Sequence, residues 1–195
     1  MISGRQSAGR PATTRDRLLE AALECAVRDG SGALSLQTIA SAAAVSKALL
    51  LYHFRDKDDV LATLVAWLTS RCVSREGVAM LKGTPAGVLD TLWNWLDSEL
   101  QSGELRVLIE LGAERGIRSR EALSASGSRR QQAAEATSAR VFQLLGLTPR
   151  VPLSMLASAE LAMREGLVVG AARAPERAVR AAFDVFWLAA LGLAQ

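Results

Sequence analysis

Apolar side chains recur every third or fourth residue over most of this 195-residue chain. Leu19, Leu23 and Val27 show this spacing near the start, and residues 85–101 repeat it in the middle of the chain. Because the spacing returns to one side of an α-helix and not of a β-strand, it predicts helices. Abundant alanine and scarce β-branched runs also favour helices over sheets. We therefore expect an all-α chain of about nine helices.

The charge balance alone does not decide the function. Lys and Arg number 23 against 20 Asp and Glu, which gives a net charge of +3 at pH 7. So small an excess does not by itself indicate a nucleic-acid partner, and the position of the charges matters more. Half of the residues are hydrophobic, which provides a sizeable core for one medium domain or for a small domain joined to a larger one.

Cysteine usage and the apolar stretches indicate a cytoplasmic chain. Cys25 and Cys72 lie far apart in no metal-binding pattern, so we expect two free buried thiols in a reducing compartment. The N-terminal stretch is polar and basic and lacks the apolar segment of a signal peptide. Residues 181–194 are the most apolar later stretch, but they include Asp184 and are too short to span a bilayer. We expect no membrane partner, no metal and no other cofactor.

Two parts can be separated at the start of the chain. Residues 1–13 carry glycine, serine and proline together with Arg5 and Arg10 but no apolar period, which indicates a flexible basic arm. Residues 14–55 then hold three short helical patterns. Thr13 can cap the first of them, with an acid three residues later in the position of a capping box.

The second and third of these helices lie four residues apart. Ser35 caps the pattern SLQTIASAA, and Ser46 caps a helix that runs to about His53. Two short helices joined by a tight turn and preceded by a third helix predict a helix-turn-helix, whose second helix fits the major groove of DNA.

The helix that Ser46 caps carries more large apolar side chains than the core of these three helices can bury. If Leu50 points into the core, 3.6 residues per turn put Phe54 on the same side and Leu49 and Leu51 on the two flanks. At least one leucine then faces outward, which suits a surface that contacts another molecule. The residues predicted to contact DNA are Ser35, Gln37, Thr38, Ser46, Lys47, Ala48, Leu49, Leu51, Tyr52, His53 and Lys57, with Arg5 and Arg10 from the arm.

The order of the capped helix SLQTIASAAAVSK, then YHF and DKDDVL, resembles the N-terminal DNA-binding domain of TetR-family transcriptional regulators. The resemblance is close over residues 14–65, and beyond them it rests on helix number, length and apolar pattern. It implies a homodimeric, ligand-responsive regulator, most often a repressor, which binds double-stranded DNA at a pseudo-palindromic operator. It also implies that the last two helices form a four-helix bundle with a partner and that a small molecule binds among helices four to eight.

Three positions depart from the pattern of this family. Ala44 stands where glycine is usual, and a left-handed conformation there would cost about 1 kcal/mol. Leu51 stands where a phosphate-contacting tyrosine is common, and Leu49 where threonine is often seen. Both leucines remove hydrogen-bonding groups from the recognition helix. We therefore expect an operator with thymine methyl groups at the contacts, or a weaker phosphate grip helped by the arm.

Residues 56–195 are expected to form the effector-binding and dimerisation domain. After the cap Asp56 and the helix that follows it, this part holds helical patterns over about 85–101, 104–115, 119–146, 153–173 and 175–193. Aromatic residues at helical spacing are more often ordinary core, so the family resemblance is what favours a cavity here. The residues predicted to bind the ligand are Trp67, Leu68, Leu89, Trp93, Leu96, Leu108, Phe142, Leu145 and Met163.

Few charges in this domain are expected to face inward. Arg106, Glu110 and Glu114 lie at spacing four and predict a solvated, ion-paired helix face in preference to a ligand anchor. A mostly apolar effector follows from that expectation.

The last two helices carry more apolar surface than one helix pair would bury alone, which predicts an isologous interface with a second copy. Gly166 and Gly170 would allow two helices to approach closely. The residues predicted at this interface are Leu161, Gly166, Leu167, Gly170, Phe183, Phe186, Trp187 and Leu191.

Catalysis is not expected. His53 has no serine, cysteine or carboxylate at a spacing that would make it a base, so we predict no catalytic residue and no enzyme. The sequence is interpreted as a sequence-specific DNA-binding regulator, a repressor released by a small, mostly apolar effector. The alternative is an all-α small-molecule-binding protein whose N-terminal helices pack on a protein partner.

Overall fold

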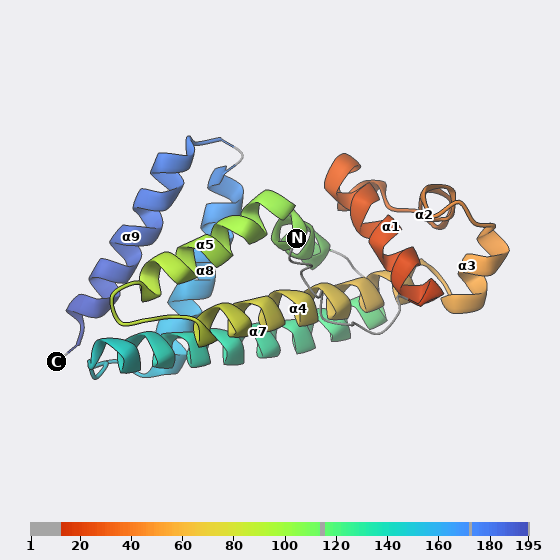
Figure 1. Ribbon diagram of the computed structural model, residues 1–195. Coiled ribbons are helices and arrows are strands. Elements are labelled where there is room, and N and C mark those ends of the chain that lie inside the picture. Colours follow the sequence, from red (N-terminus) through yellow and green to blue (C-terminus); the bar gives the residue numbers. More distant parts are fainter. Residues whose placement is uncertain (1–12, 114–115, 172, 195) are drawn as a thin grey trace, which may run out of the picture.

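The computed structural model describes residues 13–113, 116–171 and 173–194, and nearly all of them are helical (Figure 1). The elements are α1 (Thr14–Asp29), η1 (Ser31–Ala33), α2 (Leu36–Ala42), α3 (Lys47–His53), α4 (Lys57–Leu81), α5 (Val88–Ser102), α6 (Glu104–Glu110), η2 (Leu111–Ala113), α7 (Ile117–Leu145), α8 (Leu153–Ala171) and α9 (Glu176–Gly192). The only β-pairing in these residues is an isolated bridge between Pro149 and Ala194. The predicted all-α fold of about nine helices is confirmed. Residues 1–12 of the predicted arm, with Arg5 and Arg10, lie outside the described residues, and its last residue, Thr13, caps α1.

Helices α1, α2 and α3 lie together at one end of the molecule, and we call them the head (Figure 1). Helices α4 to α9 form the rest, which we call the body. Side-chain caps fix where the three head helices begin, as the sequence predicts. Thr13 Oγ1 and Ser35 Oγ each accept a hydrogen bond from the backbone N–H three residues later, at 3.1 and 3.0 Å. Ser46 Oγ does the same for α3 at 3.1 Å. Local chemistry therefore sets the spacing of the two short helices.

The core of the head is continuous with part of the body. Phe54, at the end of α3, is 1% exposed and belongs to the same apolar cluster as Leu64 of α4 and Leu108 of α6. The head is therefore packed directly on the first turns of α4 and on α6. A domain boundary between residues 55 and 56 stays a prediction.

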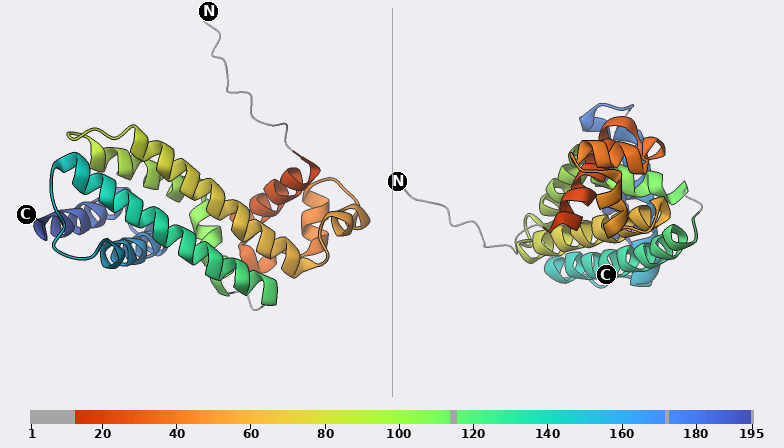
Figure 2. Two further views of the ribbon diagram at one scale, coloured as in Figure 1. Left: turned by 90° about the horizontal axis from the view of Figure 1, so that it is seen from below. Right: turned by 90° about the vertical axis from the view of Figure 1, so that its right-hand side faces the viewer.

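Helix α4 and α7 run side by side in the same direction and form the long axis of the body (Figure 2). Thr69 Oγ1 and Ser126 Oγ are 2.7 Å apart, and Thr137 Oγ1 donates to Glu76 Oε1 at 2.7 Å. The second contact lies further along both helices than the first, so α4 and α7 run parallel in a fixed register. Helix α8 packs on α7, and α9 packs on α8 and α5.

Several helix boundaries differ by a few residues from the sequence expectation. The helix expected to begin near residue 85 begins at Val88, and the one expected over residues 104–115 ends at Glu110 and tightens into η2. Pro175 is the N-cap of α9 and does not lie in its first turn. Ends that lack a side-chain cap are the ones that moved, because apolar periodicity alone does not fix a boundary.

The two cysteines agree with their expectation. Cys25 and Cys72 are free and buried. Burial, with a smaller effect of the nearby Glu99 and Glu76 carboxylates, raises the pKa of the Cys72 thiol to about 12, so this thiol stays protonated and unreactive near neutral pH. Within the described ranges, no helix is both long enough and apolar enough to cross a membrane.

Ala44, in the turn between α2 and α3, has a φ of 53°, the only positive φ outside glycine in the described residues. The Cβ atom strains this conformation by about 1 kcal/mol. We expect Ala44→Gly to raise the free energy of unfolding by about 0.5 kcal/mol, because relief of about 1 kcal/mol of strain slightly exceeds the cost of a more flexible unfolded chain. Urea unfolding monitored by circular dichroism measures it. Ala43→Gly is the control, because Ala43 has a helical φ of −77° and should gain nothing.

Candidate nucleic-acid interface and ligand site

Helix α3 presents a large apolar and aromatic surface to solvent. Tyr52 is 82% exposed, Leu51 42% and Leu49 38%, whereas Leu50 is fully buried. The Tyr52 and His53 rings contact each other edge to face, with centroids 5.2 Å apart. Both flanking leucines therefore point outward, and the buried side of α3 holds the helix in the head.

The other predicted DNA contacts within the described residues lie on α2, on α3 and at the start of α4. The Ser35, Thr38 and Ser46 hydroxyls already serve as helix caps. Lys47 and Ala48 are exposed at the start of α3, and Gln37, also exposed, donates to Ser41 Oγ at 3.4 Å. Lys57 is half-buried in the first turn of α4.

Sequence reasoning did not single out Arg55, which is exposed beside these residues. Its guanidinium has no ion-pair partner in the part of the chain that the structure describes, while its backbone N–H donates to Asp59 Oδ2 at 3.0 Å. The fixed backbone leaves the side chain available to a phosphate. Its position in the run Arg55-Asp56-Lys57, directly after Phe54, could have indicated it.

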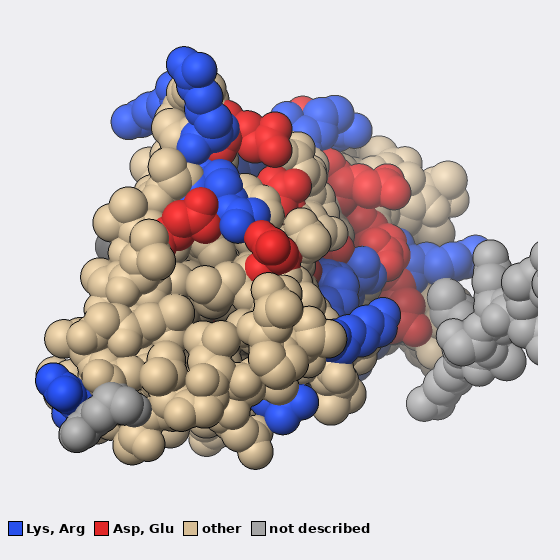
Figure 3. Space-filling view, turned by 60° about the vertical axis from the view of Figure 1, so that its left-hand side comes forward, with Lys and Arg blue, Asp and Glu red and all other residues tan. Residues whose placement is uncertain are grey.

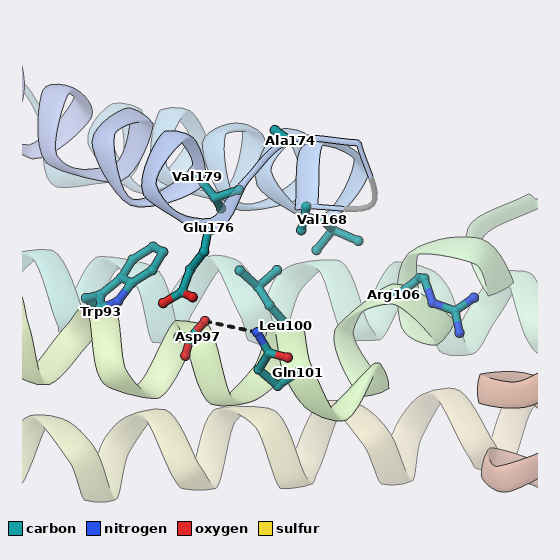
Figure 4. A pocket seen from close by; sticks show the side chains of 10 residues that line it. Trp93, Asp97, Leu100, Gln101, Arg106, Val168, Ala174, Glu176 and Val179 are labelled. Carbon is teal, nitrogen blue, oxygen red and sulfur yellow. Dashed lines mark hydrogen bonds between the residues drawn. The ribbon is translucent and has the colours of Figure 1, made fainter.

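In the body, a hollow of about 280 Å³ lies between α5, α6, α8 and α9 (Figure 4), and we call it the α5–α9 hollow. Its lining residues are Trp93, Asp97, Leu100, Gln101, Arg106, Val168, Ala171, Ala174, Glu176 and Val179. Of the nine predicted ligand residues, only Trp93 lines it. It combines an apolar wall with an aromatic ring and two carboxylates.

The other predicted ligand residues do not converge on this hollow. Leu89 and Leu145 line a second one of about 450 Å³, and Leu108 lines a third of about 330 Å³. The remaining five line none of these three hollows: Leu68, Leu96 and Phe142 are buried in the core, and Trp67 and Met163 are partly buried against it. Apolar periodicity identifies core-facing positions but cannot separate a cavity wall from solid packing. A role in ligand binding stays a prediction for these eight.

The body contains buried charges that the sequence reasoning missed. Glu76, Glu160 and Arg164 are 3%, 0% and 4% exposed. Arg164 Nη2 donates to Glu76 Oε1 at 2.7 Å and also to Glu160 Oε1. The Thr137 and Ser138 hydroxyls donate to these two carboxylates at 2.7 and 3.0 Å. The expectation of few inward charges is therefore wrong, and it no longer supports an apolar effector.

A polar contact between α6 and the end of α1 joins the body to the head. Arg106 Nη2 donates to the backbone oxygen of Val27, near the end of α1, at 2.6 Å, and Arg106 Nη1 pairs with Glu110 Oε1 at 2.6 Å. Glu110 Oε2 in turn accepts from the backbone N–H of Ser31 at 3.0 Å. The expected ion pair between Arg106 and Glu110 is present, but it ties α6 to the head, while Glu114 lies outside the described residues. Burial would raise the pKa of Glu110, but the hydrogen bond from Ser31 and the Arg106 charge hold that pKa below its ordinary value.

Within the body, another polar contact joins the start of α7 to the first turn of α4. Asp58 accepts hydrogen bonds from the backbone N–H groups of Arg118 and Ser119 at 3.0 and 3.1 Å. A Cβ on Gly116 would lie 1.8 Å from Asp58 Oδ1, so a larger residue there would displace the Asp58 carboxylate. These hydrogen bonds satisfy orphan N–H groups at the start of α7, and the negative carboxylate suits this positive helix end.

The predicted interface residues of α8 and α9 divide into two sets. Leu167, Phe183 and Trp187 are 7%, 1% and 0% exposed, because they form this chain's own core. Their side chains are already enclosed within the single chain, and their contact with a partner stays a prediction. Leu161, Phe186, Leu191 and Gly170 are partly buried, and Gly166 is exposed.

Another apolar stripe on the same two helices faces outward. Met155 and Val169 of α8 are 63% and 56% exposed, and Val185 and Leu188 of α9 are 65% and 68% exposed. A Cβ built on Gly166 or on Gly170 meets no atom within 4 Å. Figure 3 shows a wide face with few charges at the end of the molecule that holds α9. We call the surface formed by Met155, Val169, Val185 and Leu188 the α8–α9 face.

Comparison with known proteins agrees with this geometry. Residues 18–64 match the model of bacterial regulatory proteins of the tetR family. Over 103 residues the chain is 31% identical to the HTH-type transcriptional regulator AcrR of Shigella flexneri. That match covers 50% of this chain and 47% of AcrR, so the chain spans about half the length of the curated relative it matches.

Solved structures share the fold over nearly the whole chain. A transcriptional regulator from Rhodococcus sp. Rha1 is 21% identical, with a TM-score of 0.76 over 93% of this chain and 98% of that one. A TetR transcription regulator from Haloarcula marismortui ATCC 43049 is 18% identical, with a TM-score of 0.74 over 93% and 98%. FadR from Bacillus subtilis, solved with stearoyl-CoA, is 13% identical, with a TM-score of 0.67 over 87% and 96%.

The head of this chain, over residues 18–64, thus matches the tetR family of bacterial regulatory proteins. The chain as a whole shares its all-α fold with the solved structures of transcriptional regulators.

Proposed function

We propose that this chain is a DNA-binding transcriptional regulator that acts as a homodimer and is released from its operator by a small molecule. The observation that carries the proposal is the outward surface of α3, where Leu49, Leu51 and Tyr52 are exposed while Leu50 and Phe54 hold the helix in the core. A helix anchored on one side and exposed on the other is what entry into the major groove requires.

The residue types on α3 suit both kinds of DNA contact. Lys47 lies at the start of α3, the end that meets base edges in a helix-turn-helix. Leu49 suits a thymine methyl group, because that contact is apolar. Tyr52, His53 and Lys57 are placed to donate hydrogen bonds to phosphates.

The second copy would pack on the α8–α9 face. Exposed Val169, Val185 and Leu188 leave a monomer with an apolar patch that a soluble protein does not normally present. A two-fold interface there puts two α3 helices on one operator. Two half-sites about 34–36 Å apart, one turn of DNA, would then be read together.

An effector in the α5–α9 hollow would act on the head through Arg106. The Arg106 side chain lines the α5–α9 hollow, and its guanidinium donates a hydrogen bond to the backbone oxygen of Val27, near the end of α1. A ligand loosens DNA binding only to the extent that it prefers the body arrangement that does not fit DNA, and DNA must weaken the ligand equally. FadR from Bacillus subtilis was solved in complex with stearoyl-CoA, whereas the hollow here has a volume of about 280 Å³ and is lined by the Asp97 and Glu176 carboxylates as well as by Arg106.

Fluorescence anisotropy tests the regulator directly. The probe is DNA that flanks the gene for this chain, measured at low and moderate salt against a scrambled duplex. We expect the native sequence to bind more tightly, with an even number of chains per site and an affinity that falls as salt rises. Equal binding to both duplexes, repeated on genome-derived fragments, would instead support a head that packs on a protein.

Leu49 gives a sharper test of base contact. Replacing one thymine by deoxyuridine removes only its methyl group, and at the contacted position we expect the affinity to fall about threefold to tenfold. Leu49→Thr should make binding insensitive to that replacement while the protein stays folded. Leu81→Thr is the control, because Leu81 is 81% exposed at the far end of α4. If every thymine tolerates the change in the unaltered protein, Leu49 does not read a methyl group.

A further inference from the structure

The hollow that Leu108 lines lies between α6, α7 and α8, and we call it the α6–α8 hollow. Its volume is about 330 Å³. Leu108 and Ile109 of α6 and Leu123 of α7 give it an apolar wall, and Arg130 of α7 and Glu165 of α8 are its charged lining residues. It shares no lining residue with the α5–α9 hollow, so the two are separate.

The Arg130 side chain carries a buried donor that lacks an acceptor. Its side chain is 13% exposed, and Nη1 donates to Glu165 Oε1 at 3.2 Å, which places the guanidinium at the wall of the hollow. Nη2 is buried and has no hydrogen-bond partner in the part of the chain that the structure describes. Arg75 is more exposed, at 37%, yet makes three hydrogen bonds of 2.6–2.7 Å to Glu99 and Glu104. Because a nearly buried guanidinium normally finds such acceptors, one is missing beside Arg130 Nη2.

The other polar side chains of the hollow do not supply this acceptor. Glu165 is half-exposed and contacts Arg130 through Nη1 alone. The hydroxyl of the buried Ser126 is already engaged. Thr69 Oγ1 donates to the backbone oxygen of Val65 at 2.7 Å, so Ser126 Oγ donates to Thr69 Oγ1, 2.7 Å away. The lining side chains therefore offer a ligand one free donor group, the guanidinium, beside an apolar wall.

We propose that the α6–α8 hollow binds a small carboxylate that has an apolar body. The carboxylate accepts from Arg130 Nη2, since a guanidinium and a carboxylate match in shape and charge. The apolar body rests on Leu108 and Leu123. A water molecule at Nη2 is the alternative, and it would leave the hollow with no preference for anions.

The α6–α8 hollow adjoins the contacts that join the body to the head. Leu108 belongs to the apolar cluster of the head, and Arg106 and Glu110 of the same helix contact the backbone of Val27 and Ser31. A ligand that packs on α6 is therefore placed to shift the head. This step rests on the proposed function, because it makes the carboxylate an effector of that regulator.

Matched probes isolate the charge and the apolar body. Phenylacetate and phenylacetamide share one frame and differ in charge, hexanoate and hexanamide repeat the comparison on an aliphatic frame, and acetate has the charge alone. Isothermal titration calorimetry on the full chain without DNA should give one site per chain. We expect each of the two larger carboxylates to bind at least about tenfold more tightly than its amide and than acetate.

Three variants assign the charge to one side chain. Arg130→Gln should abolish the preference for carboxylate over amide. Arg129→Gln is the matched control and should change nothing, because Arg129 is the preceding residue of α7, is exposed, and contacts Ser70 outside the hollow. Glu165→Gln should tighten carboxylate binding, because it removes the one anion among the lining residues, which competes for the guanidinium.

The proposal is overturned if neither larger carboxylate exceeds its amide, if the preference survives in Arg130→Gln, or if Glu165→Gln weakens carboxylate binding. If Arg130→Gln does not fold, the first and the last of these results still decide it. Because the calorimetry contains no DNA, these outcomes overturn the ligand site alone, whereas a failure in the anisotropy assay overturns the regulator.

Discussion

Replacing Arg164 with methionine should lower the free energy of unfolding by about 3–5 kcal/mol, because it removes the one cation from a buried cluster with two carboxylates. Arg164 is 4% exposed and donates to both Glu76 and Glu160. Methionine restores much of the side-chain volume, so lost packing contributes little. Urea unfolding at neutral pH measures the change.

The geometry explains why the effect is large. Glu76 comes from α4 and Glu160 from α8, while Ser138 and Thr137 of α7 each donate a hydroxyl to one carboxylate. The Arg164 guanidinium also lies over the Trp95 ring, 4.6 Å from its centroid. Without it, two negative groups share one dry site and only hydroxyl donors remain.

The loss should depend on pH with a definite sign. Burial raises the pKa of Glu160 despite the Arg164 charge, so the folded chain holds that proton to higher pH than the unfolded chain does. A carboxyl of this kind makes stability fall as pH rises above the ordinary range of glutamate, near 4.3. Removing the arginine raises this pKa further. The deficit of Arg164→Met should therefore be smaller at pH 5 than at pH 8.

Two further variants separate charge from packing. Arg177→Met changes an exposed arginine of α9 and should stay within about 0.5 kcal/mol of the unaltered protein. Adding Glu76→Gln and Glu160→Gln to Arg164→Met should recover most of the lost stability, because no buried charge is left unpaired. A deficit below 1 kcal/mol in Arg164→Met, or one that the added changes leave untouched, would show that the cluster is not a coupled charge network.

The sequence predicted the parts of this molecule that local chemistry decides. Thr13, Ser35, Ser46 and Asp56 each begin a helix where a capping side chain stands, and the structure has all four caps. The buried side of α3 followed in the same way from 3.6 residues per turn, since Leu50 could not be buried without exposing its two neighbours.

The features that the sequence did not predict depend on contacts between helices that lie far apart in the chain. Glu160 and Arg164 at spacing four are typical of a solvated pair, and only the approach of Glu76, 84 positions earlier in the chain, makes them a buried cluster. Helix α8 and α9 are apolar on more than one side, so periodicity could not distinguish the stripe that holds Trp187 from the stripe that holds Leu188. The α5–α9 hollow depends on where α9 rests against α5, which no local pattern specifies.

Leu188→Glu should convert the proposed homodimer into monomers, with dimer dissociation rising about 100-fold or more, because a two-fold interface would bury two copies of an unpaired charge. Leu188 is 68% exposed in the α8–α9 face, so the single chain should lose no core contact and keep its stability. Sedimentation equilibrium over a range of concentrations measures the dissociation.

Ile117→Glu is a matched control, because Ile117 has the same 68% exposure but lies at the head end of α7 (Figure 1). It should leave the dimer intact. If the dimer is needed to read two half-sites together, Leu188→Glu should also weaken operator binding far more than binding to a single half-site, since only the joined heads gain from a second site nearby. A Leu188→Glu protein that stays dimeric would place the interface elsewhere, and the exposed stripe of α8 and α9 would then need another partner.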